Sequence, residues 1–247
     1  MKRQIPNLLT LGNLFCGCLG IAFVHVGNYG LGFLCLLLGA LFDFLDGFVA
    51  RLLKVSSPLG AQLDSLSDLV TFCVLPAFMV HDLFYVAAQD FLWAKKFGFY
   101  GLNALSVYPL LFAVAGSYRL AKFNVSTDQT DGFKGLPTPA AGLFLASFGL
   151  LFHHGVVFSL IDLPWIGAYT SHPIILLAAS LGLGLLMIVP IPLMALKFKN
   201  ASLKDNWVKY LLLLLAVPMV FAFGFFSIQV IVVLYLLLSI VQNLSKK

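Results

Sequence analysis

Apolar segments long enough to cross a lipid bilayer recur along this chain, and they leave few folds open to it. A spanning helix needs ~20 mostly apolar residues, because the bilayer core offers backbone groups no partner outside the helix. The composition agrees, since 61% of the residues are hydrophobic and only 10% are charged. The sequence therefore predicts an all-α, polytopic helix bundle with about eight spans. They are expected at 8–27, 31–52, 61–81, 101–123, 138–157 and 173–194, with two more in 208–242 that separate near Pro218 or Gly224.

Lysine and arginine gather on one side of this predicted topology. With a cytoplasmic N-terminus and alternating spans, thirteen of the fifteen basic residues fall at cytoplasmic ends, and only Lys95 and Lys96 fall outside. Membrane proteins carry such an excess of positive charge in their cytoplasmic loops. The distribution predicts a multi-pass protein of the cell membrane with both termini in the cytoplasm. It also accounts for the net charge of +5 without a nucleic-acid partner.

All ten acidic residues are aspartates, and four of them lie between positions 43 and 68. Ionisable groups within apolar segments are costly and indicate a functional site by default. Their helical spacing defines two faces, which are Asp43, Asp46, Gly47 and Ala50 on the span 31–52, and Gly60, Asp64 and Asp68 on the span 61–81. A turn punctuated by Pro58 and Gly60 joins the two spans. We therefore expect two antiparallel helices to direct four carboxylates into one volume near the cytoplasmic surface.

Four carboxylates at such proximity need compensation, because like charges repel strongly in a low-dielectric site. Oxygen ligands favour hard cations such as Mg2+, Mn2+ or Ca2+ over zinc. Two such ions would suit phosphoryl transfer, and Arg51 at the edge of the acidic face is placed to meet a phosphate. Gly47 and Ala50 leave room for a flat or bulky ligand. Two other interpretations stay open, namely protonated aspartates that hold helices together, or a cation pathway in a transporter.

The same window carries a longer pattern, Asp43-x2-Asp46-Gly47-x2-Ala50-Arg51-x8-Gly60-x3-Asp64-x3-Asp68. It resembles, without gap or mismatch, the signature of the CDP-alcohol phosphotransferases. The resemblance implies a six-helix catalytic core, a homodimer, and a site with two divalent cations, Mg2+ or Mn2+, that displaces CMP from a CDP-linked donor. It also implies that the metal ligands are Asp43, Asp46, Asp64 and Asp68, with Asp68 as the general base. The implied CDP contacts are Gly47, Ala50, Arg51 and Gly60, the last also allowing close helix approach.

Three further stretches, 5–14, 117–124 and 133–141, resemble the membrane-embedded, serine-using branch of this family. That likeness implies transfer of the phosphatidyl group from CDP-diacylglycerol to L-serine at the lipid bilayer. The serine hydroxyl would attack directly, after Asp68 removes its proton. Lys122 and Cys73 depart from the pattern, because arginine and glycine are expected there. Siblings that use glycerol 3-phosphate or inositol phosphate remain alternatives, and they should carry further cationic groups for a phosphorylated acceptor.

Polar residues in these stretches have two interpretations each. Asn7, Thr10 and Asn13 form one stripe on the first span, which would contact the nucleotide or hydrogen-bond to neighbouring helices. Arg119 and Lys122 lie near the cytoplasmic end of the span 101–123. They would bind the lipid phosphate or the serine carboxylate, or else extend to lipid headgroups. For domain organisation we expect a six-span catalytic core over 1–200, followed by two additional spans over 201–247.

Overall fold

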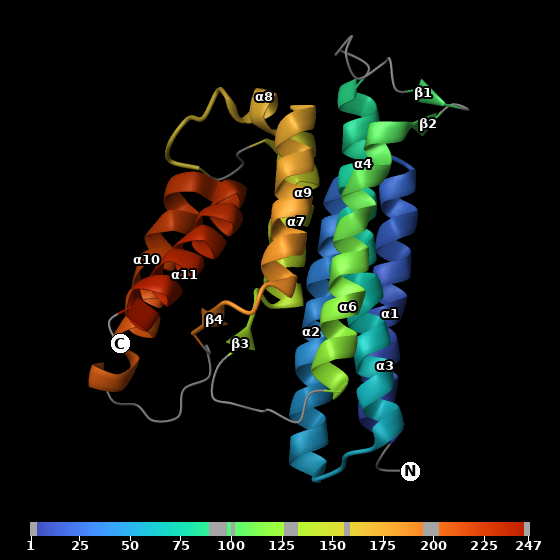
Figure 1. The fold of residues 1–247 in the computed structure, drawn as a ribbon, viewed down its shortest axis with the longest axis vertical. Coiled ribbons are helices and arrows are strands. Elements are labelled where there is room, and N and C mark those ends of the chain that lie inside the picture. The colour runs from blue at the N-terminus through green and yellow to red at the C-terminus, as the bar shows by residue number, and fades with distance from the viewer. Residues whose placement is uncertain are drawn as a thin grey trace.

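The computed structural model describes residues 4–88, 98–99, 102–125, 133–155, 159–194 and 203–244, and most of them are helical (Figure 1). The α-helices are α1 (Gln4–His25), α2 (Tyr29–Leu53), α3 (Pro58–Asp68), α4 (Leu75–Ala88), α6 (Leu111–Val125), α7 (Thr138–His154), α8 (Ile166–Thr170), α9 (Pro173–Ile188), α10 (Leu203–Phe223) and α11 (Ser227–Leu244). A π-helical segment, η1 (Leu69–Val74), joins α3 to α4. Two 3-10 segments, η2 (Ala104–Leu110) and η3 (Gly224–Phe226), precede α6 and α11.

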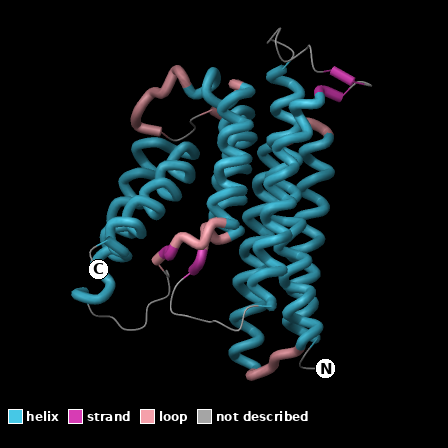
Figure 2. The backbone as a smooth tube through the Cα atoms, viewed as in Figure 1, coloured by secondary structure: helices cyan, strands magenta, loops and turns pink. Residues whose placement is uncertain are grey.

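Two short antiparallel strand pairs connect the helices (Figure 2). The first joins β1 (Gly98–Phe99) to β2 (Leu102–Asn103). The second joins β3 (Phe133–Lys134) to β4 (Pro192–Leu193), so that the segment before α7 is tied to the segment after α9.

Among the described residues, four helical stretches are long and apolar enough to cross a membrane, namely Gln4–His25, Tyr29–Leu53, Pro58–Ala88 and Asn206–Asn243. The helix Pro173–Ile188 is apolar but shorter. The prediction of a polytopic helical membrane protein is confirmed. Many of the basic residues behind the topology prediction, among them Lys95 and Lys96, lie outside the described residues.

The C-terminal stretch divides at one of the two positions expected from the sequence. α10 continues through Pro218, and the chain turns at Gly224, where φ is +53°. Glycine adopts such a positive φ at little cost, whereas other residues pay for it. α10 and α11 therefore pack against each other as a helical hairpin (Figure 1).

The span expected at 101–123 also differs in detail from the structure. Its first part is the 3-10 segment η2, which contains Pro109, and the α-helix begins only at Leu111. Proline lacks a backbone N–H and clashes with the preceding turn of an α-helix, so it favours an irregular entry to α6.

The stretch Pro58–Ala88 is the most buried of the four long stretches, and its middle part, η1, is packed unusually closely. Four glycines face η1, namely Gly17 of α1, Gly39 of α2, Gly116 of α6 and Gly142 of α7. A Cβ atom at Gly142 would collide with the backbone oxygen of Phe72. Small residues let helix backbones approach closely where no water drives association. These contacts fix α1, α2, α6 and α7 around the segment that follows Asp68.

Candidate active site

A tight turn brings the two acidic helices together. α2 ends at Lys54, which adopts a left-handed conformation and donates its backbone N–H to the carbonyl oxygens of Ala50 and Arg51. Ser57 then caps α3, because its Oγ accepts a hydrogen bond of 3.0 Å from the Gly60 N–H. Proline at the first helical position, here Pro58, suits a helix start. Helix α1 packs against both α2 and α3 and holds the pair together.

Three of the four aspartates in the window form one cluster. Asp43 of α2 and Asp64 and Asp68 of α3 each offer a carboxylate oxygen, and these oxygens lie within 4.8 Å of one another. All three side chains are partly exposed. A cluster of carboxylate oxygens is the donor set that Mg2+ and Mn2+ prefer. The residues present therefore fit a hard divalent cation.

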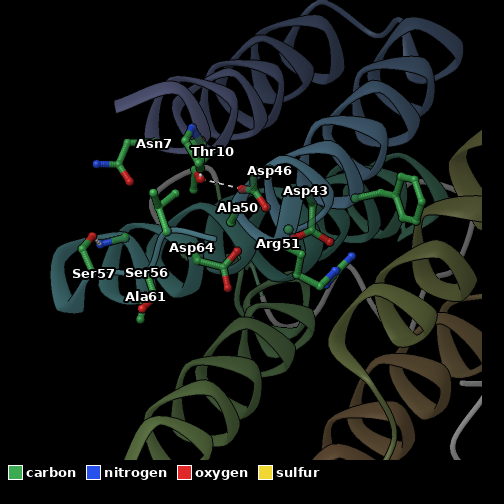
Figure 3. Close-up of a pocket in the computed structure, with 15 residues that line it drawn as sticks. Asn7, Thr10, Asp43, Asp46, Ala50, Arg51, Ser56, Ser57, Ala61 and Asp64 are labelled. Atoms are coloured by element: carbon green, nitrogen blue, oxygen red, sulfur yellow. Dashed lines mark hydrogen bonds between the residues drawn. The ribbon is translucent and has the colours of Figure 1, made fainter. Parts of the chain in front are cut away.

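Asp46 has a different environment from the other three. It is buried, and its Oδ2 accepts a hydrogen bond of 2.5 Å from Thr10 Oγ1 of α1. Thr10 is itself 3% exposed. Thr10, from the polar stripe on α1, thus hydrogen-bonds to a neighbouring helix, as one of the two interpretations of that stripe predicted. This bond holds Asp46 beside the cluster (Figure 3).

Asn13 continues this contact toward the interior. Its Nδ2 donates to Asp68 Oδ1 at 3.2 Å, and its backbone oxygen accepts from Thr71 Oγ1 at 3.0 Å. Asp68 is therefore oriented by α1, while η1 is tied to the same asparagine. Among the residues that the structure describes, Asn13 Oδ1 and Ser67 Oγ are buried without a hydrogen-bond partner.

A pocket of about 890 Å3 opens beside the cluster, between α1, α2, the α2–α3 turn and α3 (Figure 3). All residues expected to contact CDP line it, namely Asn7, Thr10, Gly47, Ala50, Arg51 and Gly60. Asp43, Asp46 and Asp64 line it as well. Asp68 is not one of the described residues that line the pocket. The pocket therefore has three carboxylates in its wall, with Asp68 close behind.

Some lining residues were not expected from the sequence. Ser56 and Ser57 come from the α2–α3 turn, and Phe44 is an exposed residue of α2. The turn itself was predictable, but nothing in its sequence showed that its hydroxyl-bearing residues border a pocket. Phe44 follows Asp43 directly, so helical spacing places it next to the acidic face rather than on it.

The guanidinium of Arg51 lies beside Gly47, one turn back along α2. The nearest atom to a Cβ built at Gly47 would be Arg51 Nη1, at 3.5 Å. The exposed Arg51 side chain thus folds back along its own helix toward the acidic face. A guanidinium in this place presents several N–H donors to a phosphate in the pocket.

Arg119 and Lys122 are separated by the structure. Arg119 of α6 is partly buried, donates from Nη1 to Thr138 Oγ1 at 2.9 Å, and interacts electrostatically with Asp68. Its Nε is buried and has no hydrogen-bond partner among the described residues. Lys122, one turn further, is exposed. Thr138 was not expected as a functional residue, although it lies in the stretch 133–141 that carried the resemblance.

Cys73 fills a space that the structure provides for it. The thiol lies against Gly116 of α6, where a Cβ would collide with the sulfur. A side chain at position 73 is thus accommodated because position 116 has none. All four cysteines are free, and Cys73 is fully buried.

Comparison with known proteins identifies the class. The sequence profile of the CDP-alcohol phosphatidyltransferase family matches residues 3–184, so the chain belongs to that family. This is a family of divalent-metal-dependent phosphotransferases. The aspartate cluster and pocket therefore form the candidate active site of an enzyme of this class.

Three relatives show which members of the family this chain is similar to. The chain is 30% identical over 187 residues to the CDP-diacylglycerol–serine O-phosphatidyltransferase of Bacillus subtilis, covering 75% of this chain and 87% of that protein. The Helicobacter pylori J99 protein of the same name is 35% identical over 148 residues, 59% of this chain and 57% of the relative. The archaetidylserine synthase of Methanothermobacter thermautotrophicus is 37% identical over 150 residues, 59% and 58% of the two chains. The chain thus spans somewhat more than half the length of the last two relatives.

Proposed function

We propose that this protein transfers the phosphatidyl group of CDP-diacylglycerol to L-serine, giving phosphatidylserine and CMP. The observation that carries the proposal is the cluster of Asp43, Asp64 and Asp68 beside a pocket lined by the rest of the family signature. The relatives named for this reaction support serine as the acceptor.

The four aspartates are assigned to metal binding. Asp43, Asp46, Asp64 and Asp68 would hold two divalent cations, Mg2+ or Mn2+, with Thr10 fixing the orientation of Asp46. When bound, such ions polarise phosphoryl oxygens and neutralise developing negative charge. The half-buried position of the cluster supports this assignment, because uncompensated carboxylates would repel one another there.

The donor nucleotide occupies the pocket. Asn7, Thr10, Gly47, Ala50 and Gly60 contact the CDP moiety, and Arg51 binds a phosphate of the same donor. The volume of about 890 Å3 is within the range of small-molecule sites. The acyl chains of the donor remain in the bilayer.

Asp68 acts as the general base. It accepts the proton of the serine hydroxyl while the serine oxygen forms a bond to the lipid-linked phosphorus, and the bond from phosphorus to the CMP oxygen breaks. The Asn13 amide keeps Asp68 oriented toward the cluster. Arg119 binds the lipid phosphate or the serine carboxylate, with the exposed Lys122 as a secondary cation at the same end of α6. The transfer is a single displacement with no covalent enzyme intermediate.

The surroundings of the site complete the proposal. The protein lies in the cell membrane with its termini and site at the cytoplasmic face, as the distribution of basic residues indicates. Residues 1–200 form the catalytic core, residues 201–247 add two helices, and two copies form a homodimer. The start of α1 and the α2–α3 turn lie at the same end of the bundle, which agrees with this orientation (Figure 1).

A direct assay tests the assignment. Purified protein is incubated with CDP-diacylglycerol, Mg2+ or Mn2+, and a panel of alcohols, with CMP release as the measurement. Release with serine alone supports the proposal, and release with glycerol 3-phosphate or inositol phosphate would make the protein a sibling enzyme. If none of the alcohols gives CMP release, a cation-transport role would become the better explanation. An Asp64→Asn variant purified in parallel shows that the CMP comes from this site.

A further inference from the structure

The C-terminal hairpin lies beyond the family match, which ends at residue 184, yet its contacts lead to Arg119. Helix α11 carries Tyr235, a buried tyrosine whose hydroxyl, if ionised, would be influenced by the charge of Arg119. The charge of Arg119 also interacts with that of Asp68. The guanidinium is therefore near enough to the aspartate cluster, and to a helix outside the matched region, for electrostatic effects.

Helix α11 also clamps the segment that follows α9. The Tyr235 hydroxyl donates to the Met194 carbonyl oxygen at 2.9 Å, and the Met194 N–H donates to Ser239 Oγ at 3.4 Å. One helical turn further, Asn243 donates to the carbonyl oxygen of Pro192. Three side chains on one face of α11 thus hold a segment of only three residues, 192–194.

That segment in turn fixes the start of α7. β4 pairs with β3, and next to this pair the Gly135 N–H donates to the Ile191 carbonyl oxygen at 2.9 Å. Gly135 has a φ of +83° and lies against carbonyl oxygens at the end of α9, a place that a side chain could not occupy. The fully buried Leu136 then donates its N–H to the Leu186 carbonyl oxygen at 2.9 Å.

Thr138 stands at the end of this series of contacts. It is the first residue of α7, is buried, and accepts the hydrogen bond from Arg119 Nη1. The position of its hydroxyl depends on where α7 begins, and hence on the β3–β4 pairing. A continuous set of contacts therefore leads from Tyr235 and Ser239 through β4 and β3 to Arg119.

We propose that the C-terminal hairpin is a positioning element for the active site, in which Tyr235 and Ser239 hold Arg119 in place through β4, β3 and Thr138. The inference rests on the proposed function in one respect, namely that Arg119 binds an anionic group of a substrate. The buried, unpartnered Nε of Arg119 is available for that group within the described part of the chain. A guanidinium binds a phosphate or carboxylate well only when its planar fork is correctly oriented.

A variant series in the full-length protein tests the inference. Tyr235→Phe removes the bond to Met194 while keeping the ring, and Ser239→Ala removes the second contact to Met194. Each variant should raise the KM of the substrate that Arg119 binds about three- to ten-fold, as loss of one hydrogen bond permits, with kcat within about two-fold. The matched control is Gln229→Leu, which weakens α11 at its contact with Ser147, away from Arg119. It should lower Tm without changing KM.

A double-mutant cycle distinguishes positioning from general destabilisation. In an Arg119→Lys background, Tyr235→Phe should have no further effect on KM, because the group that it positions is gone. Additive effects of the two substitutions, or an unchanged KM in Tyr235→Phe, would overturn the proposal.

A readout without substrate keeps the test independent of the proposed reaction. Cys73 is fully buried against Gly116 of α6, the helix that carries Arg119, so its labelling rate by a small maleimide reports on the packing of that helix. With the other three cysteines replaced by alanine, Tyr235→Phe should label several-fold faster than Gln229→Leu. Equal rates would overturn the positioning role. If the wild type releases no CMP but the two variants still differ in labelling rate, only the proposed function is disproved.

Discussion

Buried polar side chains occur both around the aspartate cluster and near the Gly224 turn of the C-terminal hairpin, but their hydrogen bonds differ. Around the cluster, Asn13 Oδ1, Ser67 Oγ and Arg119 Nε have no partner among the described residues. In the hairpin, both polar atoms of Gln229 are paired, Nε2 to Ser147 and Oε1 to Tyr169. Unpaired buried polar atoms are costly, so a region that keeps several is organised for a ligand, whereas a fully paired network holds helices together.

Removal of divalent cations should give the largest effect on the cluster side of this comparison. Treatment with EDTA should abolish CMP release, and Mg2+ or Mn2+ should restore it, whereas Zn2+ should not, because all the candidate ligands are carboxylates. Mn2+ should also raise the Tm of the wild type but not of Asp43→Asn, since a ligand stabilises only the state that binds it. Full activity after EDTA treatment would contradict a metal-dependent site.

Asp68→Asn should reduce kcat by about 10²–10⁴-fold, because the amide cannot accept the proton of the serine hydroxyl. Binding of CDP-diacylglycerol, measured by fluorescence quenching or by calorimetry, should persist because Asp68 is not one of the described residues that line the pocket. The matched control is Asp82→Asn on the same helical stretch, where the carboxylate accepts a hydrogen bond of 2.6 Å from the Tyr29 hydroxyl. That variant should keep its kcat. Substantial turnover by Asp68→Asn would rule out Asp68 as the base.

Gly142→Ala should disturb the close packing behind the cluster. Its Cβ would collide with the backbone oxygen of Phe72 in η1, which cannot move without shifting the helix that carries Asp68. Overpacking of this kind costs about 1–3 kcal/mol, so we expect a lower Tm in detergent together with reduced activity. Gly182→Ala on α9 is the control, because a Cβ there meets nothing within 4 Å. If both variants have the same Tm, the glycine contacts around η1 are not tightly packed.

Gln229→Leu should give the smallest effect and affect stability alone. Burial raises the pKa of Tyr169 to about 12, so its hydroxyl stays protonated and donates to Gln229 Oε1 at 2.7 Å. Interhelical hydrogen bonds in membranes average ~0.6 kcal/mol, so loss of two should lower Tm by a few degrees. Tyr169→Phe should show part of this decrease, since it removes one of the two bonds. A changed kcat in either variant would mean that the paired network also serves the site.

Much of the site follows from helical periodicity in the sequence. Apolar segments of sufficient length must form helices in a bilayer, because no other local structure pairs their backbone groups. The spacing of Asp43, Asp64 and Asp68 then places the carboxylates on two facing surfaces, and a short capped turn makes those surfaces neighbours. This is why Asp43, Asp46 and Asp64, which line the pocket, could be placed on facing helices from the chain alone, whereas Phe44 could not. The position of the break at Gly224, rather than at Pro218, was one of two local options and depended on a positive φ.

Contacts between distant segments could not be obtained in this way. Only the tertiary structure separates Asp46, paired with Thr10, from the other three aspartates, and only it brings Arg119 into contact with Thr138. The physical reason is that the depth and rotation at which helices cross are set by where their backbones can approach, here at the glycines around η1. Periodicity determined which face of each helix is polar, whereas packing between helices decided which polar groups meet.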